Sequence, residues 1–196
     1  MSDSVIKTIV VNRQTKETDI KLALNIQGSQ KISINTGIRF LDHMLEQLAS
    51  HGRWDLSIEV NGDTDVDDHH TVEDIAICLG DALQQSWRAL ASMQRYGQRL
   101  LPMDEALIMC AVDLSGRGIY VGELTFTREN LGSISTEMFE HFFNTLATNA
   151  AITLHIKPMY FRNNHHLAEG CFKAVAYALR EALSPASGEN TTKGML

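Results

Sequence analysis

The sequence contains one stretch of residues twice, and this repeat limits the folds open to the chain. Three pairs of segments carry it, in the same order in each half: Leu41-Asp42-His43 with Phe139-Glu140-His141, Leu48-Ala49-Ser50 with Leu146-Ala147-Thr148, and His69-His70-x-x-Glu73 with His165-His166-x-x-Glu169. The first two pairs share one constant offset, and the third has nearly the same offset. We infer an internal duplication of roughly ninety residues, with too few copies for a solenoid.

The hydrophobic pattern of each half passes from a period of two residues to a helical period. Alternating apolar residues predict strands, and the expected strands are 6–11, 20–26, 32–34, 56–60, 107–112, 119–124 and 152–156. Apolar residues three and four apart predict helices, and the expected helices are 41–51, 69–93, 139–146 and 165–183. Gly52 is expected just past the end of the first of these helices.

Strands with helices that can cover one face predict an α+β fold made of two similar halves. We expect the helices to pack between two mixed β-sheets. The first half is expected at residues 1–93 and the second at 94–186, with their boundary near Gln94 to Pro102 and a C-terminal tail at 187–196. A chain of 196 residues is long enough to fold in this way as one compact unit.

Composition excludes several classes of protein. The formal charge of −7 argues against a nucleic-acid partner but allows a small anionic substrate, whose pocket needs only a few cations. No apolar run approaches the ~20 residues of a membrane span, and Met1 to Ser4 lack the start of a signal peptide. Three isolated cysteines suit a reducing compartment. We therefore expect a cytoplasmic protein with no membrane partner.

Six of the eight histidines lie in the duplicated segments. Imidazole and carboxylate together suit Mn²⁺, Fe²⁺, Co²⁺, Ni²⁺ or Zn²⁺ better than Mg²⁺ or Ca²⁺. His70 and Glu73 are three residues apart and share a helix face, whereas His69 and His70 point about 100° apart. Each His-His pair is therefore expected to serve two different ions. A single such motif could be only a polar first helical turn, but two copies favour a bimetallic centre.

Several neighbours of these motifs are candidates for the surrounding pocket. His43, Gln47 and His51 follow one stripe of a helix, so Gln47 and His51 should line a pocket next to any metal that His43 binds. The acidic run from Asp65 to Asp68 either orients the ligands or forms a solvated loop. His155 alternates with apolar residues on a strand, and we interpret it as structural.

Five segments together resemble the signature sequences of the imidazoleglycerol-phosphate dehydratase family, and the resemblance runs in order through essentially the whole chain. These segments are Phe40-Leu41-Asp42-His43-Met44-Leu45, Asp68-His69-His70-Thr71-Val72-Glu73-Asp74, Asp113-Leu114-Ser115-Gly116-Arg117, Glu140-His141-Phe142-Phe143 and Asn164-His165-His166-Leu167-Ala168-Glu169. The chain resembles the free-standing, monofunctional form, because its length leaves no room for the phosphatase domain fused to it in some bacteria.

The resemblance implies a hydro-lyase that converts imidazole-glycerol phosphate to imidazole-acetol phosphate in L-histidine biosynthesis. It implies two Mn²⁺ per active site and a homo-oligomer of 24 subunits with active sites between subunits. It assigns one ion to His43, His70, Glu73 and His165 and the other to His69, His141, His166 and Glu169. Metal bound at both ring nitrogens would stabilise an imidazolate, which expels the hydroxyl to give a diazafulvene-like intermediate.

The same resemblance implies the catalytic and substrate-binding residues. Glu17 and Glu73 are the expected catalytic carboxylates, with Glu17 as general acid/base. The residues expected to bind substrate are Glu17, Gln47, His51, Arg95, Arg117, Lys173, Thr192 and Lys193. Arginine suits the phosphate, and the tail at 187–196 is expected to close over it. This tail departs from the family, which commonly has Pro-Ser-(Ser/Thr)-Lys-Gly where this chain has Asn190-Thr191-Thr192-Lys193-Gly194.

Two other functions use similar ligands. A di-metal phosphatase would share the His and Glu residues, but such sites commonly have a carboxylate that bridges two close ions. A ferritin-like storage bundle uses Glu-x-x-His motifs on four long helices. The reversed order of the motif here, and the alternating strands between the helices, weigh against that bundle.

Overall fold

The computed structural model describes residues 7–186 and consists of strands and helices in a repeated order. The strands are β1 (Ile9–Gln14), β2 (Thr18–Asn25), β3 (Ile32–Asn35), β4 (Asp55–Gly62), β5 (Tyr96–Met103), β6 (Ala106–Asp113), β7 (Ile119–Gly122), β8 (Asn130–Leu131), β9 (Ile134–Ser135) and β10 (Thr153–Tyr160). The helices are α1 (Arg39–Gly52), α2 (His69–Arg88), α3 (Glu137–Ala150) and α4 (Asn164–Ala182).

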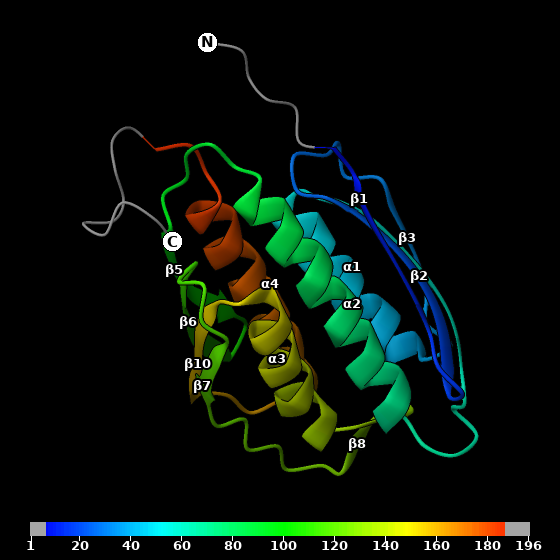
Figure 1. Ribbon diagram of the computed structural model, residues 1–196. Helices are drawn as coiled ribbons and strands as arrows, with labels where there is room; N and C mark the ends of the chain where they lie inside the picture. Colours follow the sequence, from blue (N-terminus) through cyan, green and yellow to red (C-terminus); the bar gives the residue numbers. More distant parts are fainter. Residues whose placement is uncertain (1–6, 187–196) are drawn as a thin grey trace.

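Two four-stranded sheets have the same topology. Their strand orders are β1-β2-β4-β3 and β5-β6-β10-β7. In each sheet the first three strands are antiparallel, and the last strand joins in parallel. Figure 1 shows the four helices as a layer between the two sheets. The predicted α+β class, with helices packed between two mixed sheets, is confirmed, and the sheets exclude a ferritin-like bundle.

Alternating burial explains why each sheet presents one apolar face to the helices. Ile20, Leu22 and Leu24 on β2 are fully buried, whereas Asp19 and Lys21, on either side of Ile20, are exposed. β6 repeats this pattern in the second sheet, with buried residues at every second position. Because side chains of a strand alternate between the two faces of a sheet, the inner faces form one continuous core with the helices.

The helices pair across the two halves. α1 packs against α4, and α2 packs against α3. Gly80 allows the close approach of α2 and α3, because a Cβ there would lie 2.6 Å from the Cβ of Asn149. The Trp87 indole nitrogen donates to the Ala150 carbonyl oxygen at 2.8 Å. Each helix of the first half is therefore held by a helix of the second half.

The ends of α1 and α3 repeat as well, with one difference from expectation. Arg53 and Ala151, which directly follow these helices, both adopt left-handed backbone conformations with φ of 61° and 53°. Gly52, expected just past the helix, is instead its last residue. A Cβ on Gly52 would lie 2.8 Å from the Trp54 ring, so packing of the buried Trp54 explains the glycine.

The second half contains a strand that the pattern did not predict. β5 lies where the boundary between the halves was expected, and its burial does not alternate cleanly because Gln98, Arg99 and Leu100 are all exposed. The strands divide into one sheet before residue 93 and another after residue 94. This supports the division at that point, which remains our proposal. Within residues 7–186, no helix has the length and apolar character needed to cross a membrane.

Gly97 offers a test of the packing between β5 and α4. A Cβ there would overlap the Ala178 carbonyl oxygen and lie 2.7 Å from the Ala182 nitrogen. Because both are backbone atoms, Gly97→Ala should lower the free energy of unfolding by about 1–3 kcal/mol, measured by urea denaturation. Gln98→Ala, at the neighbouring exposed position, should leave it unchanged. Equal unfolding midpoints for the two variants would contradict this packing.

Candidate metal centre

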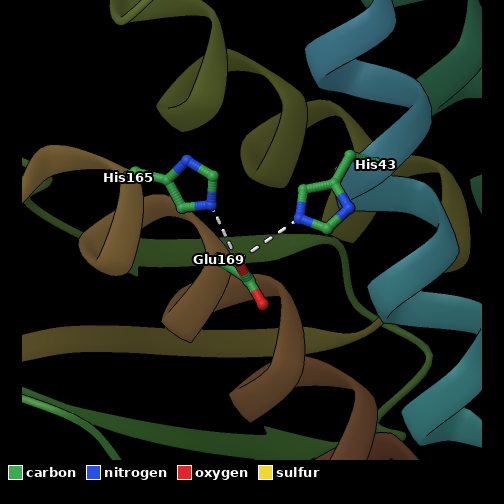
Figure 2. Close-up of side chains that lie close together, drawn as sticks. All are labelled: His43, His165 and Glu169. Carbon is green, nitrogen blue, oxygen red and sulfur yellow. Dashed lines mark hydrogen bonds and ion pairs between the residues drawn. The ribbon is translucent and has the colours of Figure 1, made fainter.

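One group of candidate ligands lies between α1 and α4. The Nε2 atoms of His43 and His165 lie 3.4 Å and 2.9 Å from the same oxygen, Oε2 of Glu169 (Figure 2). His43 projects from α1, and the other two residues project from the first turns of α4. The packing of α1 on α4 therefore brings together residues that are distant in the sequence.

A second group lies between α2 and α3. His141 Nε2 is 3.2 Å from Glu73 Oε1, and His69 Nε2 is 3.8 Å from Glu73 Oε2. The two imidazole rings lie 4.7 Å apart between centroids. His141, His69 and Glu73 are the repeat equivalents of His43, His165 and Glu169. The duplication has thus produced the same His-His-Glu cluster at two places in one chain.

The remaining motif histidines, His70 and His166, lie outside both clusters. His70 Nδ1 is 3.0 Å from Asp63 Oδ2, and His166 Nδ1 is 2.8 Å from Glu105 Oε2. The hydrogen bond that His70 donates to Asp63 raises the pKa of His70, and the hydrogen bond that His166 donates to Glu105 lowers the pKa of Glu105. Adjacent histidines of each motif therefore face different surroundings, in agreement with the ~100° helical step between them.

The donor sets of both clusters fit a divalent first-row metal. The nitrogen and oxygen atoms of each cluster lie within 4.8 Å of one another. Within the described residues, buried His141 Nε2 makes no hydrogen bond, although Glu73 Oε1 lies 3.2 Å away. Buried polar atoms are normally hydrogen-bonded, so a role as metal ligand would account for this nitrogen. Two imidazoles with one carboxylate suit manganese, iron or zinc.

The two clusters differ in the groups that surround them. Lys173 Nζ lies 2.6 Å from Glu169 Oε1, one helical turn beyond it. The equivalent residue after Glu73 is Ile77, which carries no charge. On the Glu169 side, His51 Nδ1 also lies 3.3 Å from the hydroxyl of Tyr177. Among residues 7–186, the cluster of α1 and α4 therefore has a lysine one helical turn beyond its glutamate, and the cluster of α2 and α3 does not.

Burial and the flanking cation set the ionisation of the residues near Glu169. Burial acts to raise the pKa of Glu169, but the hydrogen bonds from Lys173 and His165 outweigh it and hold this pKa below its usual value. Burial, with the charge of Lys173, lowers the pKa of His51. At neutral pH this pocket therefore combines a charged carboxylate with a neutral imidazole.

The two arginines expected to bind phosphate lie together at the other end of α4. Arg95 donates to both carboxylate oxygens of Asp113 at 2.7 Å and 3.2 Å, and Arg117 Nη2 lies 4.0 Å from the same carboxylate. The Arg95 backbone nitrogen donates to the Ala182 carbonyl oxygen. Seventeen residues of helix separate Ala182 from His165, which is roughly 25 Å at the α-helical rise. One chain therefore keeps its arginines far from its own clusters.

The other expected site residues divide in the same way. Gln47 and His51 share the α1 stripe with His43, as predicted from their spacing. Glu17 is exposed in the turn before β2, and its charge acts on His70. Thr192 and Lys193, with the tail at 187–196, lie outside the described residues.

Three contacts in this region were not predicted from the sequence. Asp63 contacts His70, Glu105 contacts His166, and Tyr177 contacts His51. Asp63 follows a strand directly, where a polar residue is ordinary. Tyr177 lies two turns beyond Glu169 on the helical repeat, and Glu105 directly precedes β6 just as Glu17 precedes β2. Alignment of the two halves through their strands could have found Glu105.

Repeated clusters of this kind, on helices enclosed between two sheets, define a candidate metalloenzyme with two related half-sites. The imidazoleglycerol-phosphate dehydratase family model matches residues 36–179. The chain is 48% identical to the imidazoleglycerol-phosphate dehydratase of Acetivibrio thermocellus, over 95% of this chain and 97% of the relative. It is 47% identical to that of Streptococcus mutans, over 95% and 97%. The chain belongs to the imidazoleglycerol-phosphate dehydratase family.

Solved structures agree with this assignment. The structure of imidazoleglycerol-phosphate dehydratase from Staphylococcus aureus matches with a TM-score of 0.83 and 34% identity, over 91% of this chain and all of that one. The Pyrococcus furiosus protein, solved in complex with (S)-C348, matches with a TM-score of 0.82 and 33% identity, over 95% and 100%. The chain accordingly has the activity of its family, that of a hydro-lyase in histidine biosynthesis.

The lowered pKa of His51 leads to a prediction about proton binding. In the metal-free chain, NMR titration of His51 should give a midpoint below 6.5, its usual value. The unfolded chain then binds more protons than the folded chain near this pH, so the contribution of His51 to the free energy of unfolding falls as the pH drops below 6.5. Lys173→Met removes a cation and should raise the midpoint, whereas Lys21→Met, exposed on the outer sheet face, should not. A wild-type midpoint at or above 6.5 would contradict this cause.

Proposed function

We propose that the residues of the two His-His-Glu clusters, together with His70 and His166, hold two manganese ions that are shared with a neighbouring chain and at which imidazole-glycerol phosphate is dehydrated to imidazole-acetol phosphate. The main support for this proposal is that the two clusters consist of the same residue types at equivalent positions of the repeat. The substrate contains one imidazole ring with two nitrogens, and two similar metal sites match these two similar atoms. When bound, the ions would act as Lewis acids toward the ring nitrogens.

The division of ligands within the chain supports sites shared between chains. The resemblance assigns His43, His165, His70 and Glu73 to one ion. In a single chain His43 and His165 lie together, whereas Glu73 lies with His69 and His141. We propose that His43 and His165 of one chain meet His70 and Glu73 of another, and that the equivalent residues of the other cluster do the same.

The position of the arginines supports the same arrangement. If Arg95 and Arg117 hold the phosphate of a small substrate, they cannot reach a cluster roughly 25 Å away along the same α4 helix. A neighbouring chain can supply them. We propose that Arg95 and Arg117, with Lys173, Gln47 and His51, bind the polar side of the substrate, and that Thr192 and Lys193 of the tail close over its phosphate.

The outer faces of the two sheets support a closed homo-oligomer. Large exposed apolar side chains gather on the second sheet, at Leu100, Met109, Ile119 and Val121. Outward residues of the first sheet are mostly polar, for example Lys21, Ser57 and Glu59, with Val10 on the edge strand β1 as the exposed apolar exception. Apolar patches on a surface mark contacts between proteins, and closed symmetry is usual in oligomers. We propose that the outer face of the second sheet packs on other copies of the chain in a 24-subunit shell. His155, on β10, also lies on this outer face.

Glu17 is proposed to move protons at the glycerol carbons. Its carboxylate is exposed at a turn next to His70. Within residues 7–186 it has no side-chain hydrogen bond or ion pair, so it is free to meet a substrate. We propose Glu73 as the second catalytic carboxylate, which also binds metal. The diazafulvene-like route and the location of the enzyme in the cytoplasm remain predictions.

Turnover of Glu17→Gln tests the reaction together with this assignment. Wild-type protein should convert imidazole-glycerol phosphate to its keto product. Glu17→Gln should lower kcat by about 10²–10⁴-fold because the amide cannot transfer the proton, with metal content and assembly unchanged. Asp19→Asn, an exposed carboxylate on the adjoining strand, serves as the control. Wild-type activity in Glu17→Gln would exclude its role, and release of inorganic phosphate without keto product would overturn the dehydration itself.

Removal of a shared ligand should affect both metal and assembly. His70→Asn or His166→Asn should lose bound Mn²⁺, measured by elemental analysis, and weaken the shell, measured by solution mass, because the ligands join subunits. His155→Asn, a histidine outside both His-His-Glu clusters and outside the contacts with Asp63 and Glu105, should keep its metal. A fully active, metal-free shell of either variant would contradict the proposed sites.

A further inference from the structure

We propose that Asp63 and Glu105 are positioning residues that orient His70 and His166 for metal binding between chains. This inference deepens the proposed function and rests on it, because it takes both histidines as metal ligands. Neither carboxylate belongs to either His-His-Glu cluster. Each instead contacts the one histidine of its motif that the helix turns away from the cluster.

Glu105 is itself held in place by two contacts. Its Oε2 lies 2.8 Å from His166 Nδ1, and its Oε1 accepts a hydrogen bond from the Asn163 backbone nitrogen at 2.9 Å. Asn163 caps α4, where its side chain accepts from the His165 nitrogen. The carboxylate thus ties the turn between β5 and β6 to the first turn of α4, and the ring of His166 cannot rotate without the loss of this bond.

Asp63 makes the same contact with His70 from a different loop. Its Oδ2 lies 3.0 Å from His70 Nδ1. Its backbone nitrogen donates to the Glu17 carbonyl oxygen at 3.1 Å, and its carbonyl oxygen accepts from the Val66 nitrogen at 2.8 Å. The backbone on both sides of this carboxylate is therefore fixed, although Asp63 Oδ1 is buried without a partner among the described residues.

The strand registers show that these two carboxylates are not repeat equivalents. Leu24 pairs with Leu56 in the first sheet, and Val112 pairs with Leu154 in the second. Counting back along β2 and β6 by equal steps places Glu17, not Asp63, at the position of Glu105. The two halves have therefore reached the same Nδ1 contact from different loops. In the first half, Asp63 contacts His70 Nδ1, and among the described residues the Glu17 carboxylate has no hydrogen bond to a histidine.

The chemistry of imidazole explains why the contact matters. A neutral ring carries one proton, and a carboxylate on Nδ1 holds the proton there and leaves the lone pair on Nε2. The carboxylate also fixes the ring plane and increases the electron density on the ligating nitrogen. Loss of such a contact typically weakens metal affinity by 10–100-fold. A ligand that must meet an ion held partly by another chain depends strongly on this fixed direction.

Mn²⁺ titration of the assembled full-length protein, followed by the EPR signal of free Mn²⁺, tests the proposal. Glu105→Gln should weaken one of the two sites per chain by about 10–100-fold, and Asp63→Asn should weaken the other. Alanine at either position should weaken the same site at least as much, and the double variant should weaken both. Glu59→Gln, an exposed carboxylate on β4, the strand before Asp63, is the matched control and should bind both ions as wild type does.

A second readout separates orientation from a general loosening of the loop. The ¹⁵N shifts of His70 and His166 in the metal-free protein should report a proton on Nδ1, and this preference should decrease in the corresponding variant alone. Unchanged affinity and unchanged shifts in both amide variants would overturn the positioning role. A wild-type protein that binds fewer than two Mn²⁺ per chain would instead overturn the proposed manganese sites, whatever the variants do.

Discussion

The pairing of each helix with one from the opposite half is the constraint on which this structure depends. α1 packs on α4 and α2 packs on α3, so the two copies of the repeat cannot form separate cores. The same pairing places His43 beside His165 and Glu169, and His141 beside His69 and Glu73. A repeat that folded on itself would leave each histidine of α1 and α3 without the carboxylate it now faces. The same helix packing therefore forms the core and brings the candidate ligands together.

Duplication supplied two equivalent clusters, and later substitutions made them different. Lys173 stands beside Glu169, where the first half has the apolar Ile77 beside Glu73. The second sheet exposes several large apolar side chains on its outer face, whereas the first sheet exposes mostly polar ones, Val10 apart. A symmetric pair of metals suits an imidazole ring, but a substrate with a phosphate on one side needs an asymmetric pocket. The two halves therefore differ beside the clusters and on the outer faces of the sheets, whereas their shared core and their His-His-Glu residues are alike.

The repeat, the hydrophobic periodicity and the motif spacing were sufficient to predict most of this fold. They did not predict the contacts that loops make with residues distant in the sequence. Strands such as β2 and β6 alternate cleanly because one face is buried, so their pattern is visible in the sequence. β5 was missed because it lies at a sheet edge and its exposed positions do not alternate. Helical geometry led us to expect that His69 and His70 point in different directions, and in the structure they contact different carboxylates, Glu73 and Asp63. The contact of Asp63 with His70 could not be predicted, because it depends on how a loop approaches a helix. Glu105 could have been located only by aligning the two halves through their strands, since it precedes β6 as Glu17 precedes β2.

The arrangement of the histidines agrees with the proposal that each site is shared between chains. The first histidine of each motif faces the partner helix, and the second faces away toward a loop carboxylate. Adjacent helical residues point about 100° apart, so one ion is not expected to bind both histidines of one helix. On the proposed ligand assignment each motif serves two ions, and one chain supplies only part of the ligands of each ion. The remaining ligands then come from another chain, so that metal binding and assembly would depend on each other.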